Sequence, residues 1–318
     1  MVVAKVGGKN SLRATCRSLR LAVNTCTSAL KWVGTGGCVA GAPPTQLILP
    51  VAVLALKLLD CNGRHVRSHS LTRVSDLSPL VVYSSLQSLD CSYTRVAELV
   101  PLAACAASLQ ALDCSNTWVS DLGPAAACTL LQTPNCSGFT RVAQLGPLAA
   151  CTFMQNLDCS FTGVSQLGPL AACTLLQYLN CSGNPRVAEL GPLAACTSLL
   201  TLNCSYSAVS QLGPLAVCTS LRTLNCSHTA LSNLGPLAAC TSLQALECNR
   251  TEVTELGPLA TCALQQALDC RRTKVTEVGP LAACISLARL ACPLSVTLSQ
   301  IQLLREVCRS LDKKVEQG

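Results

Sequence analysis

A unit of 22 or 23 residues recurs along most of this 318-residue chain, and a repeat of that length constrains the architecture more than any single residue does. One copy, from Pro236 to Leu256, reads PLAACTSLQALECNRTEVTEL. A unit this short cannot bury an apolar face alone, so the copies are expected to stack into one solenoid domain. A cysteine marks the same place in each copy: Cys61, Cys91, Cys114, Cys136, Cys159, Cys181, Cys204, Cys226, Cys248, Cys270 and Cys292.

The second half of each unit predicts a short strand. The segment 109–119 has the form L-x-x-L-x-C-x-x-T-x-V. Alternate side chains of an extended strand point to opposite faces, so Leu112 and Cys114 are expected to point inward, and Asp113 and Ser115 toward water. Parallel stacking of such strands would bury a row of Leu, a row of Cys and a row of Val that includes Val119, and would give a curved sheet with a solvated concave face.

The first half of each unit, for example 235–240, returns the chain along the convex side. Its proline suits the first turn of a helix, and the two alanines that follow favour a short helix or 3₁₀ turn. A second set of cysteines falls in this turn and is expected to be buried: Cys105, Cys128, Cys151, Cys173, Cys196, Cys218, Cys240, Cys262 and Cys284.

The strand pattern resembles that of leucine-rich repeat proteins, L-x-x-L-x-L-x-x-N/C-x-L, with cysteine at the third apolar position. Its length and its Gly-Pro-Leu punctuation most resemble the short-repeat class that includes bacterial internalins, and the resemblance covers residues 77 to 292. It implies an α/β solenoid with a parallel β-sheet on the concave face and short helical or 3₁₀ turns on the convex face. It also implies binding of a partner protein, although repeats of this kind serve many unrelated partners.

Three segments are predicted from these patterns. Residues 1–46 form a basic N-terminal segment, 47–292 hold the repeats with an insertion near 64–73, and 293–318 form a C-terminal helical cap. A capping box at Ser299 and Gln302 would start the cap helix. An apolar helical stripe would cover the last repeat: Ile301, Leu304, Cys308, Leu311 and Val315.

The basic, acid-free stretch 11–24 has three interpretations. It is a helical cap for the solenoid, or an Arg- and Ser-rich organelle transit peptide. In the third, 12–24 with 28–32 resembles the closing helix of an F-box, a module often placed before leucine-rich repeats, although the upstream Leu-Pro opening is missing. The sequence leaves these three interpretations open.

The charge distribution argues against nucleic acid as a partner. The net charge of +7 arises near the termini, because residues 74–302 hold nine bases and twelve acids. Aromatic residues make up only 3% of the chain, too few for base-stacking platforms. The apolar run 47–59 is too short to span a bilayer, which takes about 20 helical residues, so it is assigned to the first repeat. We therefore expect a monomer without membrane insertion.

The 24 cysteines favour a reducing compartment. Adjacent strands lie about 4.8 Å apart, whereas a disulfide requires Cβ atoms about 3.5 to 4.5 Å apart, so the cysteines are expected to be reduced thiols packed as small hydrophobes. This predicts a cytoplasmic protein, with organelle import left open. Five N-glycosylation sequons are interpreted as unused, and all but the last are by-products of the repeat's Asn-Cys-Ser triplet: Asn135, Asn180, Asn203, Asn225 and Asn249.

No pattern in the sequence indicates an enzyme, a metal or a cofactor. The chain has no C-x-x-C pair, and the step of eight or nine residues from turn cysteine to strand cysteine is not a zinc-finger spacing. The three histidines, His65, His69 and His228, belong to no motif that would activate a cysteine nucleophile. We therefore predict a protein without catalytic, cofactor or metal-binding residues.

Candidate partner-binding residues lie on the concave face and on the rim beyond it. The position before the strand cysteine is polar in the copies from Asp90 to Asp269, whereas the positions two and four beyond the cysteine differ between copies, as at Arg272 with Lys274. Aromatic and arginine side chains at such exposed positions anchor protein interfaces. The predicted partner-binding residues are Tyr93, Arg95, Asp90, Asp113, Trp118, Asp158, Phe161, Tyr206, His228 and Arg250.

The function predicted from these patterns is that of an intracellular scaffold that binds a partner protein through this surface. Two alternatives remain: a substrate-recognition, F-box-like subunit of a ubiquitin ligase, and a surface or secreted recognition protein that resembles internalins.

Overall fold

The structure is a computed structural model. It describes the backbone of residues 2–3, 19–23, 29–34 and 58–60, and then residues 74–138, 140–308, 311 and 315–317. The chain forms two compact units, Met1–Met154 and Gln155–Gly318, and each is described by itself.

The first unit alternates strands with 3₁₀ turns, and Pro lies in the first turn of each 3₁₀ segment. Its strands are β1 (Val2–Val3), β2 (Leu19–Val23), β3 (Ala29–Gly34), β4 (Leu58–Asp60), β5 (Ser88–Asp90), β6 (Ala111–Asp113) and β7 (Thr133–Asn135). Its 3₁₀ turns are η1 (Ser78–Val82), η2 (Val100–Cys105), η3 (Gly123–Ala127) and η4 (Gly146–Ala150).

The second unit continues the same alternation. Its strands are β8 (Asn156–Asp158), β9 (Tyr178–Asn180), β10 (Thr201–Asn203), β11 (Thr223–Asn225), β12 (Ala245–Glu247), β13 (Ala267–Asp269), β14 (Arg289–Cys292) and β15 (Val315–Gln317). Its turns are η5 (Gly168–Ala172), η6 (Gly191–Ala195), η7 (Gly213–Val217), η8 (Gly235–Ala239), η9 (Gly257–Thr261) and η10 (Gly279–Ala283), and one α-helix follows, α1 (Leu298–Val307).

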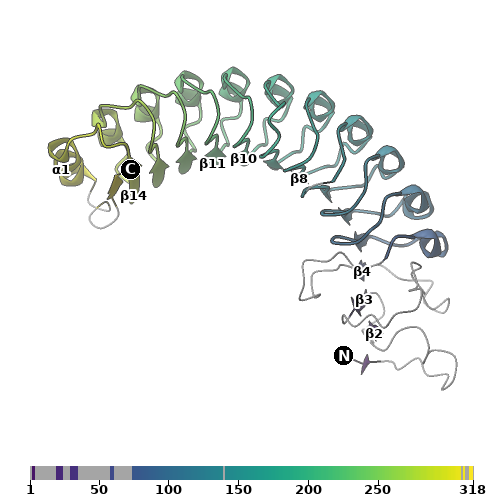
Figure 1. Cartoon of the computed structure of the whole chain (residues 1–318). Coiled ribbons are helices and arrows are strands. Elements are labelled where there is room, and N and C mark those ends of the chain that lie inside the picture. The colour runs from purple at the N-terminus through teal and green to yellow at the C-terminus, as the bar shows by residue number, and fades with distance from the viewer. Residues whose placement is uncertain are drawn as a thin grey trace. The chain divides into compact units, whose positions relative to one another are not determined.

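Within each unit the repeat strands pair in parallel and in register. Leu89 is opposite Leu112 in the first unit, and Leu202 is opposite Leu224 in the second. In each unit the strands lie on the inner, concave side and the 3₁₀ turns on the outer side (Figure 1). The predicted leucine-rich repeat solenoid, with its parallel sheet and 3₁₀ turns, is confirmed.

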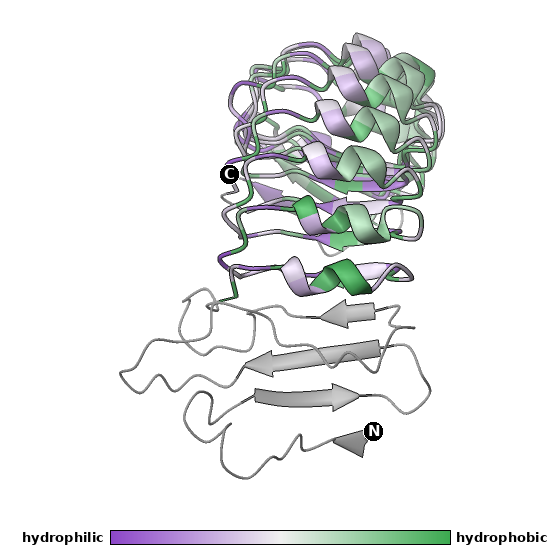
Figure 2. Ribbon diagram, turned by 90° about the vertical axis from the view of Figure 1, so that its right-hand side faces the viewer, coloured by the Kyte–Doolittle hydropathy of each residue, from purple (hydrophilic) through white to green (hydrophobic). Residues whose placement is uncertain are grey.

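The core consists of the apolar side chains that the repeat places at fixed positions. Leu112, Cys114 and Val119 are at most 2% exposed, as predicted, and the equivalent residues of other described copies are similarly buried. The 3₁₀ turns contribute Leu and Cys, and Figure 2 shows apolar residues on these turns in copy after copy. Each repeat therefore stabilises its neighbours through continuous rows of Leu, Cys and Val.

The cysteines of the 3₁₀ turns do more than fill space. The Sγ of Cys240 donates to the carbonyl oxygen of Leu215 at 3.4 Å, and the Sγ of Cys262 donates to those of Leu237 and Cys240 at 3.6 Å. Each thiol thus adds a second hydrogen bond to a carbonyl group of the preceding repeat that already accepts a backbone N–H, as the carbonyl of Leu215 does from the N–H of Cys218 at 2.9 Å. We call this set the turn ladder; its hydrogen-bonded members are Cys151, Cys196, Cys218, Cys240, Cys262, Cys284 and Cys308.

The C-terminal segment continues the repeat as well as covering it. Helix α1 takes the place of a 3₁₀ turn, and the Sγ of Cys308 donates to the carbonyl oxygens of Leu281 and Cys284 at 3.7 and 3.3 Å. Strand β15 then pairs in parallel with β14. Ile301 and Leu304 are buried, as the predicted helical stripe requires.

Two details of the predicted cap are wrong. The capping box is formed by Thr297 and Gln300, not by Ser299 and Gln302, because the chain already enters the helix at Leu298. Val315 belongs to β15 and not to the helical stripe, since the helix ends at Val307 and the chain returns to the sheet edge.

The N-terminal segment differs from the predicted helix where the structure describes it. Residues 19–23 form strand β2, which pairs antiparallel with β1 and β3. The alternation of Leu19, Leu21 and Val23 with Arg20 and Ala22 has the period of a strand, and a sheet edge offers backbone partners that a helix cannot use. The rest of the stretch 11–24 and the insertion at 64–73 lie outside the described residues, and the predicted segment boundaries stay predictions.

No helix among the described residues is both long enough and apolar enough to cross a membrane.

Candidate functional site

Strands β5 to β13 each lead into a tight loop whose central residue has a left-handed backbone. The non-glycine residues there have φ between 53° and 57°, and the two glycines, Gly138 and Gly183, have φ of 77° and 68°. Left-handed geometry costs an L-residue roughly 1 to 2 kcal/mol. We call this set the loop row: Tyr93, Asn116, Gly138, Phe161, Gly183, Tyr206, His228, Arg250 and Arg272.

Hydrogen bonds hold the loop in this shape. In the loop that follows β6, the backbone N–H and the hydroxyl of Ser115 donate to Oδ1 of Asp113 at 2.9 and 2.6 Å. The hydroxyl of Thr117 donates to the carbonyl of Cys114 at 2.6 Å, and the N–H of Asn116 donates to the carbonyl of Ser137 at 2.9 Å. The loop row is therefore presented on a fixed backbone.

The same bonds correct the expected orientation of the serines. Ser115 is only 2% exposed instead of facing water, because the strand ends at Asp113 and the alternation of an extended chain stops there. Of the predicted site residues, Asp113 accepts the hydrogen bonds of its own loop, and Asp90 and Asp158 do the same for Ser92 and Ser160. These half-buried carboxylates border the loop row and shape it.

Side chains of the loop row lie against the next position of the row. A Cβ placed on Gly183 would come within 2.5 Å of the ring of Phe161, so the phenyl ring covers the glycine. Asn116 lies in the same way against Gly138, where a Cβ would come within 2.5 Å of its amide. Tyr206 and His228 stack, with 4.0 Å between ring centroids.

The structure brings together two of the predicted residues in the first unit. The guanidinium carbon of Arg95 lies 5.7 Å from the ring centroid of Trp118, within cation–π range. Tyr93 is 38% exposed and Trp118 is 52% exposed. We call Tyr93, Arg95 and Trp118 the rim patch.

The second unit holds the other predicted residues, which follow one another along the loop row. Phe161 and Tyr206 are about half exposed, His228 is half-buried and Arg250 is exposed. Burial lowers the pKa of His228, and the positive charges of Arg250 and Arg272 lower it further. The row thus changes from aromatic to basic between β10 and β13.

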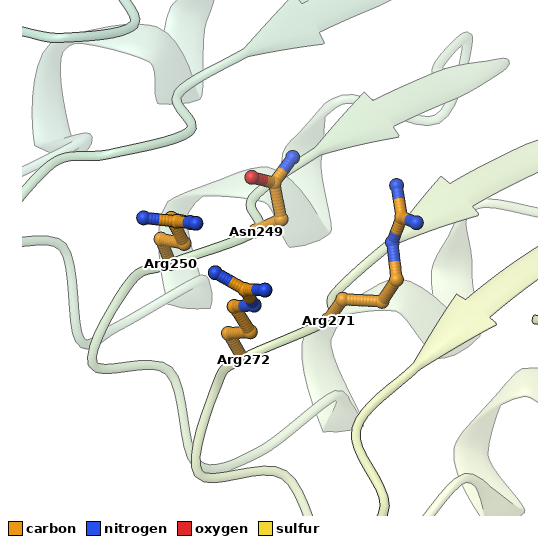
Figure 3. Close-up of a pocket in the computed structure, with 4 residues that line it drawn as sticks. All are labelled: Asn249, Arg250, Arg271 and Arg272. Atoms are coloured by element: carbon orange, nitrogen blue, oxygen red, sulfur yellow. The ribbon is translucent and has the colours of Figure 1, made fainter. Parts of the chain in front are cut away.

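A shallow hollow of about 250 Å³ lies at the basic end of the row, lined by Asn249, Arg250, Arg271 and Arg272 (Figure 3). Arg271 forms two hydrogen bonds with Asp269, at 3.0 and 2.7 Å, and one with Glu316 at 3.3 Å. The hydrogen bonds to Asp269 and the charge of that carboxylate raise the pKa of Arg271, and the charge of Glu316 contributes less.

Asn249 and Arg271 were not among the predicted partner-binding residues. The sequence does mark these positions. Serine follows the strand cysteine in every copy from Ser92 to Ser227, and Asn249 and Arg271 replace that serine in the next two copies. In the hollow, Asn249 donates to the hydroxyl of Ser227 at 2.9 Å and to Asp269 at 3.3 Å. Both residues thus belong to the frame that holds the hollow.

The buried cysteines are poorly suited to catalysis. Burial raises the pKa of Cys204 to about 12 and that of Cys240 to about 11, and for Cys240 the neighbouring thiols add to the effect. A thiol that stays protonated is a weak nucleophile and a weak metal ligand. Among the described residues, His, Cys, Asp and Glu form no group of three or more that could hold a metal ion.

No family model and no curated protein matches the chain. Similar solved structures exist. An internalin from Listeria monocytogenes is 21% identical, with a TM-score of 0.70 over 77% of this chain and 71% of that one. The functional domain of InlJ from the same species, which includes a cysteine ladder, is 20% identical, with a TM-score of 0.69 over 89% of this chain and 62% of that one.

A leucine-rich repeat protein from Leptospira interrogans is 13% identical, with a TM-score of 0.67 over 87% of this chain and 82% of that one. At sequence identities this low, the similarity concerns the fold alone. With its parallel strands, its 3₁₀ turns and its period of 22 or 23 residues, the chain has the short-repeat leucine-rich repeat fold that internalins have.

Proposed function

We propose that this protein is a non-enzymatic scaffold that binds a partner protein through its concave face and the adjoining rim, which consists of the loop row and the residues just beyond it. The observation that carries the proposal is the loop row itself. Tyr93, Phe161 and Tyr206 keep bulky, exposed rings in a left-handed conformation that glycine adopts without cost at Gly138 and Gly183.

The arrangement suits protein recognition for two reasons. The loops are fixed by internal hydrogen bonds, so side chains on them lose little conformational freedom on binding. Exposed aromatic and arginine side chains, as in the rim patch, are the types that contribute most to protein interfaces.

We further propose an intracellular, reducing environment. The described cysteines are buried in rows, where neighbouring repeats keep them as packing groups, and Cys204, Cys240 and Cys262 among them are free thiols. Titration of free thiols in the denatured protein, purified from its native cell under alkylating conditions, tests this proposal. Mostly paired cysteines would favour the surface or secreted alternative instead.

The rim patch offers the direct test of the binding proposal. Once a partner has been purified with the chain, truncating Trp118 to Ala should weaken the complex about thirtyfold, which corresponds to about 2 kcal/mol. The ring of Trp118 is exposed and the core residues of its repeat stay in place, so the melting temperature should change little. Phe153→Ala, an equally exposed ring outside both the rim patch and the loop row, is the matched control.

Two results would count against this site. Unchanged affinity in a Tyr93→Ala, Trp118→Ala double variant would remove the rim patch from the interface. Parallel losses of affinity and melting temperature in Trp118→Ala would make Trp118 a packing residue.

A further inference from the structure

Four consecutive positions of the loop row in the second unit differ in character from the rest. Tyr206, His228, Arg250 and Arg272 follow strands β10, β11, β12 and β13, and all four have left-handed backbones. Neighbouring strands of a sheet lie about 4.8 Å apart, so the row is a closely spaced series of two stacked rings and two guanidinium groups.

The two arginines of this series lack opposite charges. Among the described residues, neither Arg250 nor Arg272 forms a side-chain hydrogen bond or an ion pair, although both line the hollow (Figure 3). The acidic side chains of the neighbouring repeats are engaged elsewhere. Asp269 and Glu316 pair with Arg271, and Glu252 pairs with Lys274.

Two like charges on adjacent loops repel one another, and an anionic group placed between them would relieve that repulsion. Guanidinium groups bind carboxylates through paired hydrogen bonds, which gives such a group a defined position. Asn249 and Arg271, held in place by Asp269, form the wall of the hollow behind the two free guanidinium groups.

The surroundings favour single acidic groups over a polyanion. The strand face beside the row carries carboxylates, among them Asp158, Glu247 and Asp269, and residues 74–302 hold more acids than bases. A nucleic acid or an anionic membrane would bring many charges against this face. An acidic side chain of a protein brings one, and Tyr206, 53% exposed, offers an apolar contact next to the basic end.

We propose that the loops after β10 to β13 bind an extended segment of a partner protein in which an apolar side chain contacts Tyr206 and one acidic side chain lies between Arg250 and Arg272. About two and a half strand spacings separate these two places, roughly 12 Å, which an extended chain spans in about four residues. An even number of residues also puts both side chains on the same face of the segment, so the apolar residue and the acidic residue are four positions apart.

The inference rests on the proposed protein-binding function, and it is tested with a defined probe. The probe is a fluorescein-labelled peptide, Gly-Phe-Gly-Gly-Gly-Glu-Gly-amide, and its partner carries Gln in place of Glu. Fluorescence anisotropy with the full chain at low salt should show at least tenfold tighter binding of the Glu peptide.

The preference should disappear in Arg250→Gln, Arg272→Gln. It should persist in Arg222→Gln, which removes one positive charge from an exposed residue just before β11, at the opposite end of the strands. Arg250 and Arg272 are both exposed, so the double variant should melt like the wild type, and the melting curve verifies this.

Three results would overturn the inference. The first is equal affinity for the two peptides, including no measurable binding of either; the second is an equal loss in Arg222→Gln. The third is tighter binding of a single-stranded RNA oligonucleotide or of phosphatidylserine vesicles that depends on the same two arginines.

If any of these occurs while Trp118→Ala still weakens the purified complex, only this inference falls. If the preference for the Glu peptide holds while Trp118→Ala leaves the affinity of the purified complex unchanged, the basic end of the loop row binds an acidic segment and the rim patch is not part of the interface.

Discussion

The imidazole ring of His228 stacks on the phenol ring of Tyr206, with 4.0 Å between the ring centroids and 19° between the ring planes. The two rings come from neighbouring repeats, and both residues occupy the left-handed position of their loops. A stacked aromatic pair contributes roughly 0.5 to 1.5 kcal/mol, which offsets part of the backbone cost of that position. The stack therefore joins the aromatic part of the loop row to the two arginines that follow.

The pKa of His228 should report on those arginines. It lies below the ordinary value of 6.5, first because burial disfavours the charged ring and then because Arg250 and Arg272 repel that charge. In Arg250→Gln, Arg272→Gln the repulsion is gone and the desolvation remains, so the pKa should rise without exceeding the ordinary value. A pH titration of the imidazole C–H signals by NMR measures it, with Arg222→Gln as control. A pKa unchanged by the double substitution would contradict the electrostatic coupling.

Gln265 should be replaceable with a gain in stability. It lies in the core at a position that Leu243 and Leu221 occupy in other copies, it is fully buried, and its Oε1 has no hydrogen-bond partner among the described residues. Its Nε2 donates to the carbonyl of Ala267 at 2.7 Å. A buried, unsatisfied polar group costs about 1 to 3 kcal/mol, so Gln265→Leu should raise the free energy of unfolding by that order.

Urea unfolding of Gln265→Leu and of the wild type, at matched pH, measures the difference. Leu243→Gln is the reciprocal variant and should lose stability by a comparable or larger amount. A less stable Gln265→Leu protein would show that the hydrogen bond from Gln265 Nε2 to the Ala267 carbonyl contributes more stability than the unsatisfied Oε1 costs.

Cys204 should tolerate small neutral side chains and reject charge. Its side chain is fully buried between β10 and its neighbours, and an unpaired carboxylate there would cost several kcal/mol. Since each repeat is stabilised by the next, Cys204→Asp should melt several adjacent repeats at neutral pH, with Cys204→Ser milder. Thermal unfolding followed by circular dichroism measures the difference. Superimposable curves for Cys204→Asp and wild type would mean that this position is not buried.

Alkaline pH should destabilise the protein through its thiols. Burial raises the pKa of the Cys240 and Cys284 thiols from 9.0 to about 11, with a contribution from neighbouring thiols. A raised folded-state pKa contributes stability that is complete below pH 9 and is lost as the pH rises from 9 toward 11, because only the unfolded chain releases these protons easily. Each such thiol lowers the free energy of unfolding by at most about 1.4 kcal/mol per pH unit in that range.

Urea unfolding under reducing conditions, at a series of pH values from neutral to mildly alkaline, measures this slope. The variant Cys240→Ala, Cys284→Ala loses two of the titrating groups and should show a shallower decline above pH 9, although it is less stable at pH 7. Parallel pH profiles for the variant and the wild type would show that other groups cause the alkaline loss.

The sequence was sufficient for the architecture because the repeat fixes which side chains are buried. Leu112, Cys114 and Val119 were predicted to face the core from spacing alone, and they do. The left-handed loops were not predictable in the same way. Tyr93 and Phe161 are not residue types that favour positive φ, and the conformation is imposed by hydrogen bonds from Ser and Thr side chains that the repeat pattern does not reveal.

The start of the cap helix shows a second limit of the sequence. Thr297 with Gln300 and Ser299 with Gln302 both have the capping-box spacing, so the pattern alone cannot choose between them. Burial of Ile301 and Leu304 against the last repeat determines which box forms. The basic hollow was missed for another reason, since Asn249 and Arg271 acquire a role only when neighbouring loops are brought together.

The turn ladder has a consequence for how such a chain changes over generations. Each thiol donates to carbonyl groups of the copy before it, and that copy offers the same acceptors wherever it stands, as the bonds from Cys262 to Leu237 and from Cys308 to Leu281 illustrate. Loss or gain of one whole unit by unequal recombination therefore leaves every donor facing an acceptor. Length can vary in steps of one unit without a new core, whereas an insertion of any other size within the regular array breaks the series at one point.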